Sequence, residues 1–187
     1  MDTQRTFIAL PLTQEIHDAL REVQNELRQE VSKVRWTRPE GVHITLKFLG
    51  DTDSSVVDQL IPALDEVASG HHPFELKLNG TGAFPRLANP RVLWVGLETS
   101  EELLALQHDV EEAIAPFGFE KEKRKFKAHL TLARLQGDLW PEGHRRLLLD
   151  ARKTIDGLIL PVKELILFRS DLKPDGAVYT ALHRAKL

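Results

Sequence analysis

The chain has 187 residues, which is enough for one domain or for two small lobes sharing a core. Its 42% hydrophobic and 28% charged residues are typical of a soluble globular protein. The absence of cysteine excludes disulfides, thiol nucleophiles and cysteine-ligated zinc. A net charge of −3 excludes a broad basic surface, so any contact with nucleic acid must be local. With no signal-peptide pattern and no apolar run of membrane-spanning length, we expect a cytoplasmic protein with no membrane contact.

The first half of the chain alternates strand and helix patterns. Thr13 is the expected N-cap of the first helix, which carries apolar residues at three- and four-residue spacing. The elements expected in order are a strand at 6–10, a helix at 13–31, a basic connector at 35–39, a strand at 42–50, a helix at 54–68, a strand at 74–78 and a turn-rich stretch at 80–90.

The second half repeats this order. Ser100 is the expected N-cap of its first helix, and Pro116 and Gly118 end that helix. The expected elements are a strand at 92–97, a helix at 100–115, a strand within 119–135, a helix opened by Trp140-Pro141-Glu142 and running to 151, strands at 157–160 and 163–170, and a last strand at 177–182 after the turn at 174–176.

One short motif occurs in both halves, as His43-Ile44-Thr45-Leu46 and as His129-Leu130-Thr131-Leu132. Each copy lies in a predicted strand, where alternation places histidine and threonine on one face and the apolar residues on the other. The repeat indicates an internal duplication. We therefore predict an α+β fold in which residues 1–187 form one duplicated domain with two pseudo-symmetric lobes, each an antiparallel sheet flanked by helices. The lobes lie at about 5–80 and 91–187, with exchange of terminal strands left open, and a central cleft brings the two motifs together.

Two imidazoles facing one cleft can act as acid and base in a single reaction. Histidine suits both roles because its unperturbed pKa lies near neutral pH, and each role contributes roughly 10²–10⁴ in rate. The hydroxyls of Thr45 and Thr131 can donate to the oxygens of an anion held between the rings. Phosphate is the obvious anion, so His43 and His129 are the candidate catalytic residues.

The fifth residue after each histidine differs between the halves. Arg134 follows His129 and can hold phosphate oxygens through a bidentate fork. Strict alternation would turn Arg134 away from His129, so this role requires the strand to end or bulge near Ala133. Phe48 follows His43; we expect it in the core, and stacking on a base is the alternative.

Further basic residues are candidates for lining the cleft. Lys125 and Lys127 share the face of His129 and can line the rim, although a solvated basic strand is an equal alternative. Arg38 precedes the first motif and is a further candidate, with a surface role as its alternative.

The paired motifs resemble those of the two-histidine phosphoesterases, and in particular of the RNA 2′,3′-cyclic phosphodiesterases, also called 2′-5′ RNA ligases. Three other stretches carry the resemblance, at 5–11, 35–42 and 170–180, so that it covers nearly the whole chain. The resemblance implies an enzyme that hydrolyses RNA 2′,3′-cyclic phosphate ends to 2′-phosphates without metal or cofactor. It also implies reversible, ATP-independent 2′-5′ joining of RNA ends.

The resemblance also implies roles that the residues alone leave open. His43 would be the proton donor to the departing 3′ oxygen and His129 the proton acceptor from water. Thr45, Thr131 and Arg134 would bind the phosphate. The expected partner is RNA with a 2′,3′-cyclic phosphate end, with tRNA halves or nucleotides as candidates, and the expected state is a monomer.

Three alternatives remain open at this point. A zinc hydrolase built on His43 and His129 would need a third ligand, and threonine is a poor one. A module that binds RNA ends or 2′-5′ oligonucleotides without turnover would use the same cleft. An enzyme of the same superfamily could take a small cyclic nucleotide or an ADP-ribose cyclic phosphate.

Overall fold

The computed structural model describes residues 3–31, 34–135, 142–173 and 176–187. Its strands and helices follow the predicted order closely. They are β1 (Thr3–Leu10), α1 (Gln14–Glu30), β2 (Val34–Trp36), β3 (Ile44–Asp53), α2 (Ser54–Ser69), β4 (Phe74–Arg86), β5 (Asn89–Leu97), α3 (Glu101–Ile114), β6 (His129–Leu135), α4 (Glu142–Asp150), β7 (Ile159–Val162), β8 (Glu164–Lys173) and β9 (Gly176–Lys186). Short 3₁₀ turns cover Pro39–Gly41, Ala115–Phe117 and Ala151–Thr154.

The strands form two sheets, with orders β3-β1-β8-β9 and β2-β6-β5-β4-β7. The strand pairs within the described residues are all antiparallel. Apart from the added β2, the second order repeats the first, with β6 at the place of β3 and β5 at the place of β1. The α+β architecture of two antiparallel sheets with helices is therefore confirmed.

The two halves of the chain exchange strands. β4, from the first half, pairs with β5 in the second sheet, and β8, from the second half, pairs with β1 in the first sheet. Sheet membership therefore does not follow the consecutive ranges 5–80 and 91–187. The exchange ties the sheets together, and their buried apolar residues form a single cluster.

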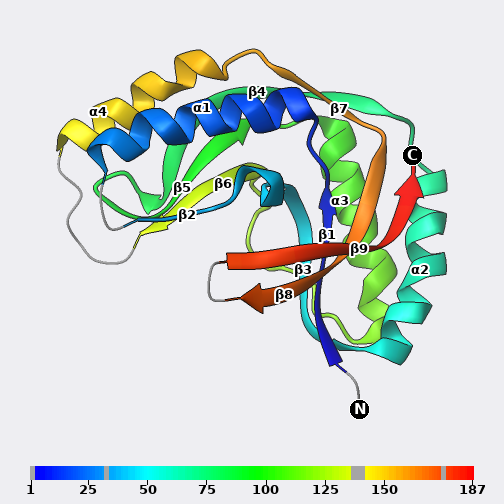
Figure 1. Ribbon diagram of the computed structural model, residues 1–187. Helices are drawn as coiled ribbons and strands as arrows, with labels where there is room; N and C mark the ends of the chain where they lie inside the picture. Colours follow the sequence, from blue (N-terminus) through cyan, green and yellow to red (C-terminus); the bar gives the residue numbers. More distant parts are fainter. Residues whose placement is uncertain (1–2, 32–33, 136–141, 174–175) are drawn as a thin grey trace.

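Each sheet has a pair of helices on one side. α1 and α4 lie side by side along the second sheet, while α2 and α3 lie together against the first (Figure 1). Gln24 of α1 fixes this packing, because its buried side-chain amide donates to the carbonyls of Thr37 and Leu132 at 2.7 and 2.9 Å. Within the described part of the chain, no helix has both the length and the apolar character that a membrane crossing requires.

Local signals placed the starts of α1 and α3 correctly. The side chains of Thr13 and Ser100 accept hydrogen bonds from the backbone N–H groups of Ile16 and Leu103, as N-caps do. The residues predicted to open the fourth helix, Trp140-Pro141, and the turn residues 174–175 lie outside the described residues.

Two connections were predicted wrongly. The stretch at 80–90 is not mainly turn: β4 runs to Arg86 and β5 begins at Asn89, because cross-strand pairing outweighs the glycine and proline signals. The basic connector at 35–39 includes part of a strand, β2, which pairs with β6. Both corrections matter for the cleft, since each adds residues to the sheet beside the second motif.

Candidate active site

A β-bulge brings Arg134 to the face of the second motif. Two consecutive residues of β5 pair with Ala133 and Thr131, so Leu132 between them has no opposite residue. Leu132 and Ala133 are both buried, and Arg134 is exposed on the face that carries His129 and Thr131. The bulge that a phosphate-binding Arg134 requires is thus present.

The same bulge occurs in the first motif. Two consecutive residues of β1 pair with Lys47 and Thr45, which leaves Leu46 without an opposite residue. Phe48 consequently occupies on β3 the position that Arg134 occupies on β6. It is 50% exposed, so the expected core role of Phe48 is wrong. The bulge reverses the face that simple alternation assigns to it.

Both histidine rings are held by the same backbone contact. Nδ1 of His43 donates to the carbonyl of Gly41 at 2.8 Å, and Nδ1 of His129 donates to the carbonyl of Lys127 at 2.8 Å. A carbonyl oxygen only accepts, so Nδ1 must carry the proton. In each neutral ring, Nε2 is then the unprotonated nitrogen, available to accept a proton from the cleft.

Aromatic rings surround His43. Phe7 stacks on the imidazole at 4.5 Å between centroids, Tyr179 meets it edge-on at 5.1 Å, and Phe168 lies at 6.1 Å. Burial among these rings, opposed by the hydrogen bond to the Gly41 carbonyl and aided by the charge of His129, lowers the pKa of His43 to about 4. The His43 imidazole is therefore neutral at pH 7.

His129 has a more open setting. Phe84 of β4 meets its ring edge-on at 5.0 Å. Burial, with a smaller contribution from the charge of Arg134, lowers the pKa of His129, and the hydrogen bond to the Lys127 carbonyl opposes that shift. At neutral pH the unliganded site therefore favours two neutral imidazoles.

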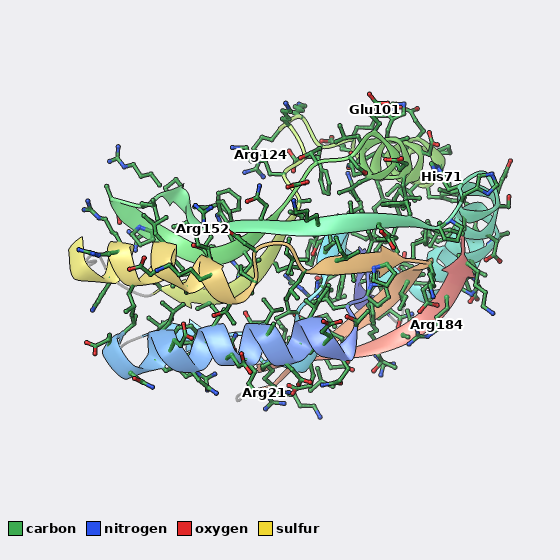
Figure 2. The ribbon with its side chains drawn as sticks, turned by 90° about the horizontal axis from the view of Figure 1, so that it is seen from above. Arg21, His71, Glu101, Arg124, Arg152 and Arg184 are labelled. Atoms are coloured by element: carbon green, nitrogen blue, oxygen red, sulfur yellow. The ribbon has the colours of Figure 1, made fainter. Side chains whose placement is uncertain are left out.

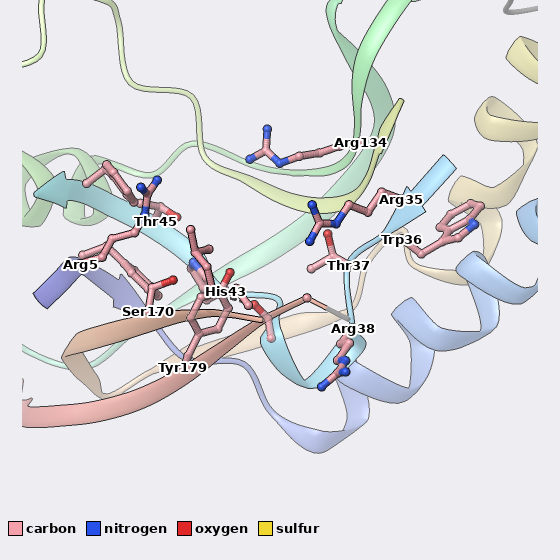
Figure 3. Close-up of a pocket in the computed structure, with 16 residues that line it drawn as sticks. Arg5, Arg35, Trp36, Thr37, Arg38, His43, Thr45, Arg134, Ser170 and Tyr179 are labelled. Atoms are coloured by element: carbon pink, nitrogen blue, oxygen red, sulfur yellow. Dashed lines mark hydrogen bonds between the residues drawn. The ribbon is translucent and has the colours of Figure 1, made fainter. Parts of the chain in front are cut away.

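Two adjoining cavities form the cleft between the sheets. One has a volume of about 480 Å³ and contains His43 and Arg134 in its lining (Figure 3). The other, of about 800 Å³, contains His129. Thr45 and Phe48 line both, so the cavities meet at the first motif.

Most of the other candidate residues line one of these two cavities. Arg38 is exposed and lines the cavity of His43, while Lys125 and Lys127 line the cavity of His129. Thr131 is half-buried on the face of His129 but does not line either cavity. Of the two motif threonines, Thr45 is therefore the one that lines the cleft.

Several lining residues were not selected from the sequence as site residues. Arg5, Arg35 and Tyr179 line the cavity of His43, and Phe84 lines that of His129. Tyr179 arrives through β9, a strand distant in sequence, so no local pattern connects it with the motif. Arg5 lies 4.6 Å from the centroid of the Phe48 ring, in a cation–π contact.

The first cavity is suited to anions. The described residues of its lining include Arg5, Arg35, Arg38 and Arg134 and no carboxylate. Among the described residues, no three histidine, aspartate or glutamate side chains are grouped as metal ligands. The donors present are guanidinium, hydroxyl and imidazole groups, which match phosphate oxygens.

The comparison with protein families agrees with this architecture and this lining. The family described as "LigT like Phosphoesterase" matches twice, at residues 10–94 and 95–179. The chain therefore belongs to the LigT-like phosphoesterase family.

Individual relatives are similar along most of the chain. An RNA 2′,3′-cyclic phosphodiesterase of Methanothermobacter thermautotrophicus is 30% identical over 98% of this chain and 98% of its own. Another of that name, from Archaeoglobus fulgidus, is 36% identical over 71% of this chain and 73% of its own. The crystal structure of TT0787 from Thermus thermophilus matches with a TM-score of 0.82 and 30% identity over 98% of this chain and 97% of that one.

Proposed function

We propose that this protein hydrolyses RNA 2′,3′-cyclic phosphate ends to 2′-phosphates, using His43 and His129 as the proton-transferring pair. The observation that carries the proposal is the matched hydrogen bonding of the two rings, which leaves Nε2 of each directed away from its own backbone contact. The names of the relatives from Methanothermobacter and Archaeoglobus support the substrate class.

The proposed step moves two protons and exchanges one bond. His129 Nε2 takes a proton from water as the water oxygen attacks phosphorus, and protonated His43 Nε2 gives its proton to the 3′ oxygen as the phosphorus–oxygen bond breaks. The products are a 2′-phosphate and a 3′-hydroxyl. Thr45 and Thr131 donate to the non-bridging oxygens, and Arg134 binds them through its guanidinium. With the 5′-hydroxyl of a second RNA in place of water, the same step forms a 2′-5′ link without ATP.

The burial of His43 favours a second allocation of the two roles. A proton donor must be charged, and the pKa of His43 is lowered to about 4. The bound phosphate carries a negative charge that raises the pKa of both rings and so opposes this shift. If the phosphate's effect is too small, His129 is the donor and His43 the acceptor.

A substrate with a good leaving group separates the two allocations. A nucleoside 2′-(p-nitrophenyl) phosphate needs no proton donor, because nitrophenolate, in the place of the 3′ oxygen, leaves unassisted. If His43 is the donor, His43→Ala loses roughly 10²–10⁴ in kcat on the cyclic substrate and much less on the nitrophenyl ester. His129→Ala then loses a similar factor on both. The reverse pattern assigns His129 as the donor.

The proposed reaction itself is tested in ¹⁸O-labelled water. A short RNA with a 2′,3′-cyclic end should give a 2′-phosphate carrying one ¹⁸O, at a rate unaffected by a chelator. A rate abolished by EDTA and restored by zinc would favour a zinc hydrolase, and binding without turnover would favour a non-catalytic module. Turnover of small cyclic nucleotides alone would transfer the assignment to that substrate class.

A further inference from the structure

Two arginines face each other across the strand pair at the edge of the second sheet. Arg35 on β2 is paired directly with Arg134 on β6, so the two residues share one face. Figure 3 shows both guanidinium groups on the cavity side of their strands. Like charges directly opposite in a sheet destabilise it, so an anion between them would relieve a cost that the unliganded sheet carries.

No carboxylate in the described part of the chain neutralises this pair. On the outer surface, by contrast, Arg21, Arg152 and Arg184 each have an acidic partner within 2.8 Å (Figure 2). Arginines of this protein that face solvent are thus commonly paired, whereas Arg35 and Arg134, which line the cavity, form no ion pair with a described carboxylate. This difference indicates that the pair is kept for a ligand.

The charge in the cavity exceeds what one cyclic phosphate can use. A cyclic phosphodiester has a single negative charge and two non-bridging oxygens, and Thr45 and Arg134, which both line this cavity, can provide donors for them. Arg35 lies one strand further out than Arg134, beside Thr37, which also lines the cavity. An RNA end offers a second phosphate one nucleotide away, in the linkage to the rest of the chain.

We propose that Arg35, facing Arg134 across β2 and β6, binds the phosphodiester that joins the terminal nucleotide to the RNA chain. This subsite makes the enzyme prefer oligonucleotide ends to mononucleoside 2′,3′-cyclic phosphates. The proposal rests on the proposed function and specifies which form of that substrate the site selects.

The test uses three substrates that differ only around this linkage. They are a dinucleotide with a 2′,3′-cyclic end, the same dinucleotide with an uncharged methylphosphonate linkage, and the mononucleoside 2′,3′-cyclic phosphate. Wild type should prefer the charged dinucleotide, mainly through KM. Arg35→Gln should reduce the ratio of kcat/KM for the charged over the uncharged dinucleotide about tenfold, which is the scale of one charge-assisted contact.

Two further variants control the experiment. Arg35→Lys keeps the charge and should restore part of the ratio. Arg146→Gln removes an arginine of α4 that is 88% exposed and lies outside both cavities, and it should leave the ratio unchanged. Circular dichroism at the assay temperature confirms that each variant is folded.

The outcomes separate this proposal from the proposed function. Equal losses on all three substrates in Arg35→Gln would overturn the subsite, because Arg35 would then act on the reacting phosphate. An unchanged ratio would overturn it as well. If wild type hydrolyses none of the three substrates, the proposed function itself is refuted.

Discussion

Protonation of His43 should destabilise the folded protein by an amount that the structure sets. The folded-state pKa of His43 is lowered to about 4 from a usual 6.5, mainly by burial under Phe7 and its neighbouring rings. Between these two pH values the unfolded chain binds a proton that the folded protein does not, so the free energy of unfolding rises with pH over this window. At 1.36 kcal/mol per pKa unit, His43 alone removes about 3 kcal/mol of stability between pH 7 and pH 4.

Urea unfolding at pH 7, 6, 5 and 4 measures this contribution. His43→Gln cannot take up the proton, so its stability should fall by about 3 kcal/mol less than that of wild type over the same range. His72→Gln makes the same substitution at an exposed histidine outside both cavities and serves as the control. Parallel pH dependences for wild type and His43→Gln would refute the buried, neutral imidazole.

Three further predictions follow from the described contacts. The pH profile of kcat/KM should be bell-shaped, with its optimum between about pH 4 and 6.5. The reason is that the pKa values of both histidines are lowered in the free protein, while one ring must be charged and the other neutral for the reaction. A flat profile over pH 4–8 would contradict this prediction. Lys47→Met should destabilise the protein by roughly 3–5 kcal/mol in urea unfolding, because it leaves the buried carboxylate of Glu111, now 2.6 Å from Lys47 Nζ, without an opposite charge. A change below about 1 kcal/mol, on the order of a surface pair, would contradict a buried charge pair. Arg134→Gln should lower kcat/KM roughly tenfold or more, as loss of a charge-assisted phosphate contact does; an unchanged value in steady-state kinetics excludes Arg134 from the site.

The sequence was sufficient for the repeat and for the local elements. Two copies of one motif indicated the duplication, and Thr13 and Ser100 cap their helices as expected. Such features depend on residues close together in the chain, which is why patterns of spacing predict them.

Strand partners depend on contacts that spacing does not record. The exchange of β4 and β8 between the halves leaves the pattern of apolar residues in each strand unchanged and alters only which strand it pairs with. β2 has three residues, too few to show alternation, so Arg35 could not be placed opposite Arg134. Tyr179 reaches His43 only through the long pairing of β8 with β9.

Bulges explain why the residue after each motif was difficult to assign. After the bulges at Leu46 and Leu132, each of the next two residues lies on the face of the sheet opposite to the one that simple alternation predicts. For Arg134 the need for a bulge could be stated in advance, because a chemical role required it. For Phe48 no such requirement existed, so an apolar side chain was assigned to the core.

The most direct test of the central claim is a product assay with both histidine variants. A 5′-labelled short RNA with a 2′,3′-cyclic phosphate end is incubated with wild type, His43→Ala and His129→Ala, and the 2′- and 3′-phosphate products are resolved. We expect the 2′-phosphate from wild type and a rate at least about 10²-fold lower from each variant. A wild-type rate in either variant, or a 3′-phosphate as the main product, would contradict a reaction carried out between these two imidazoles.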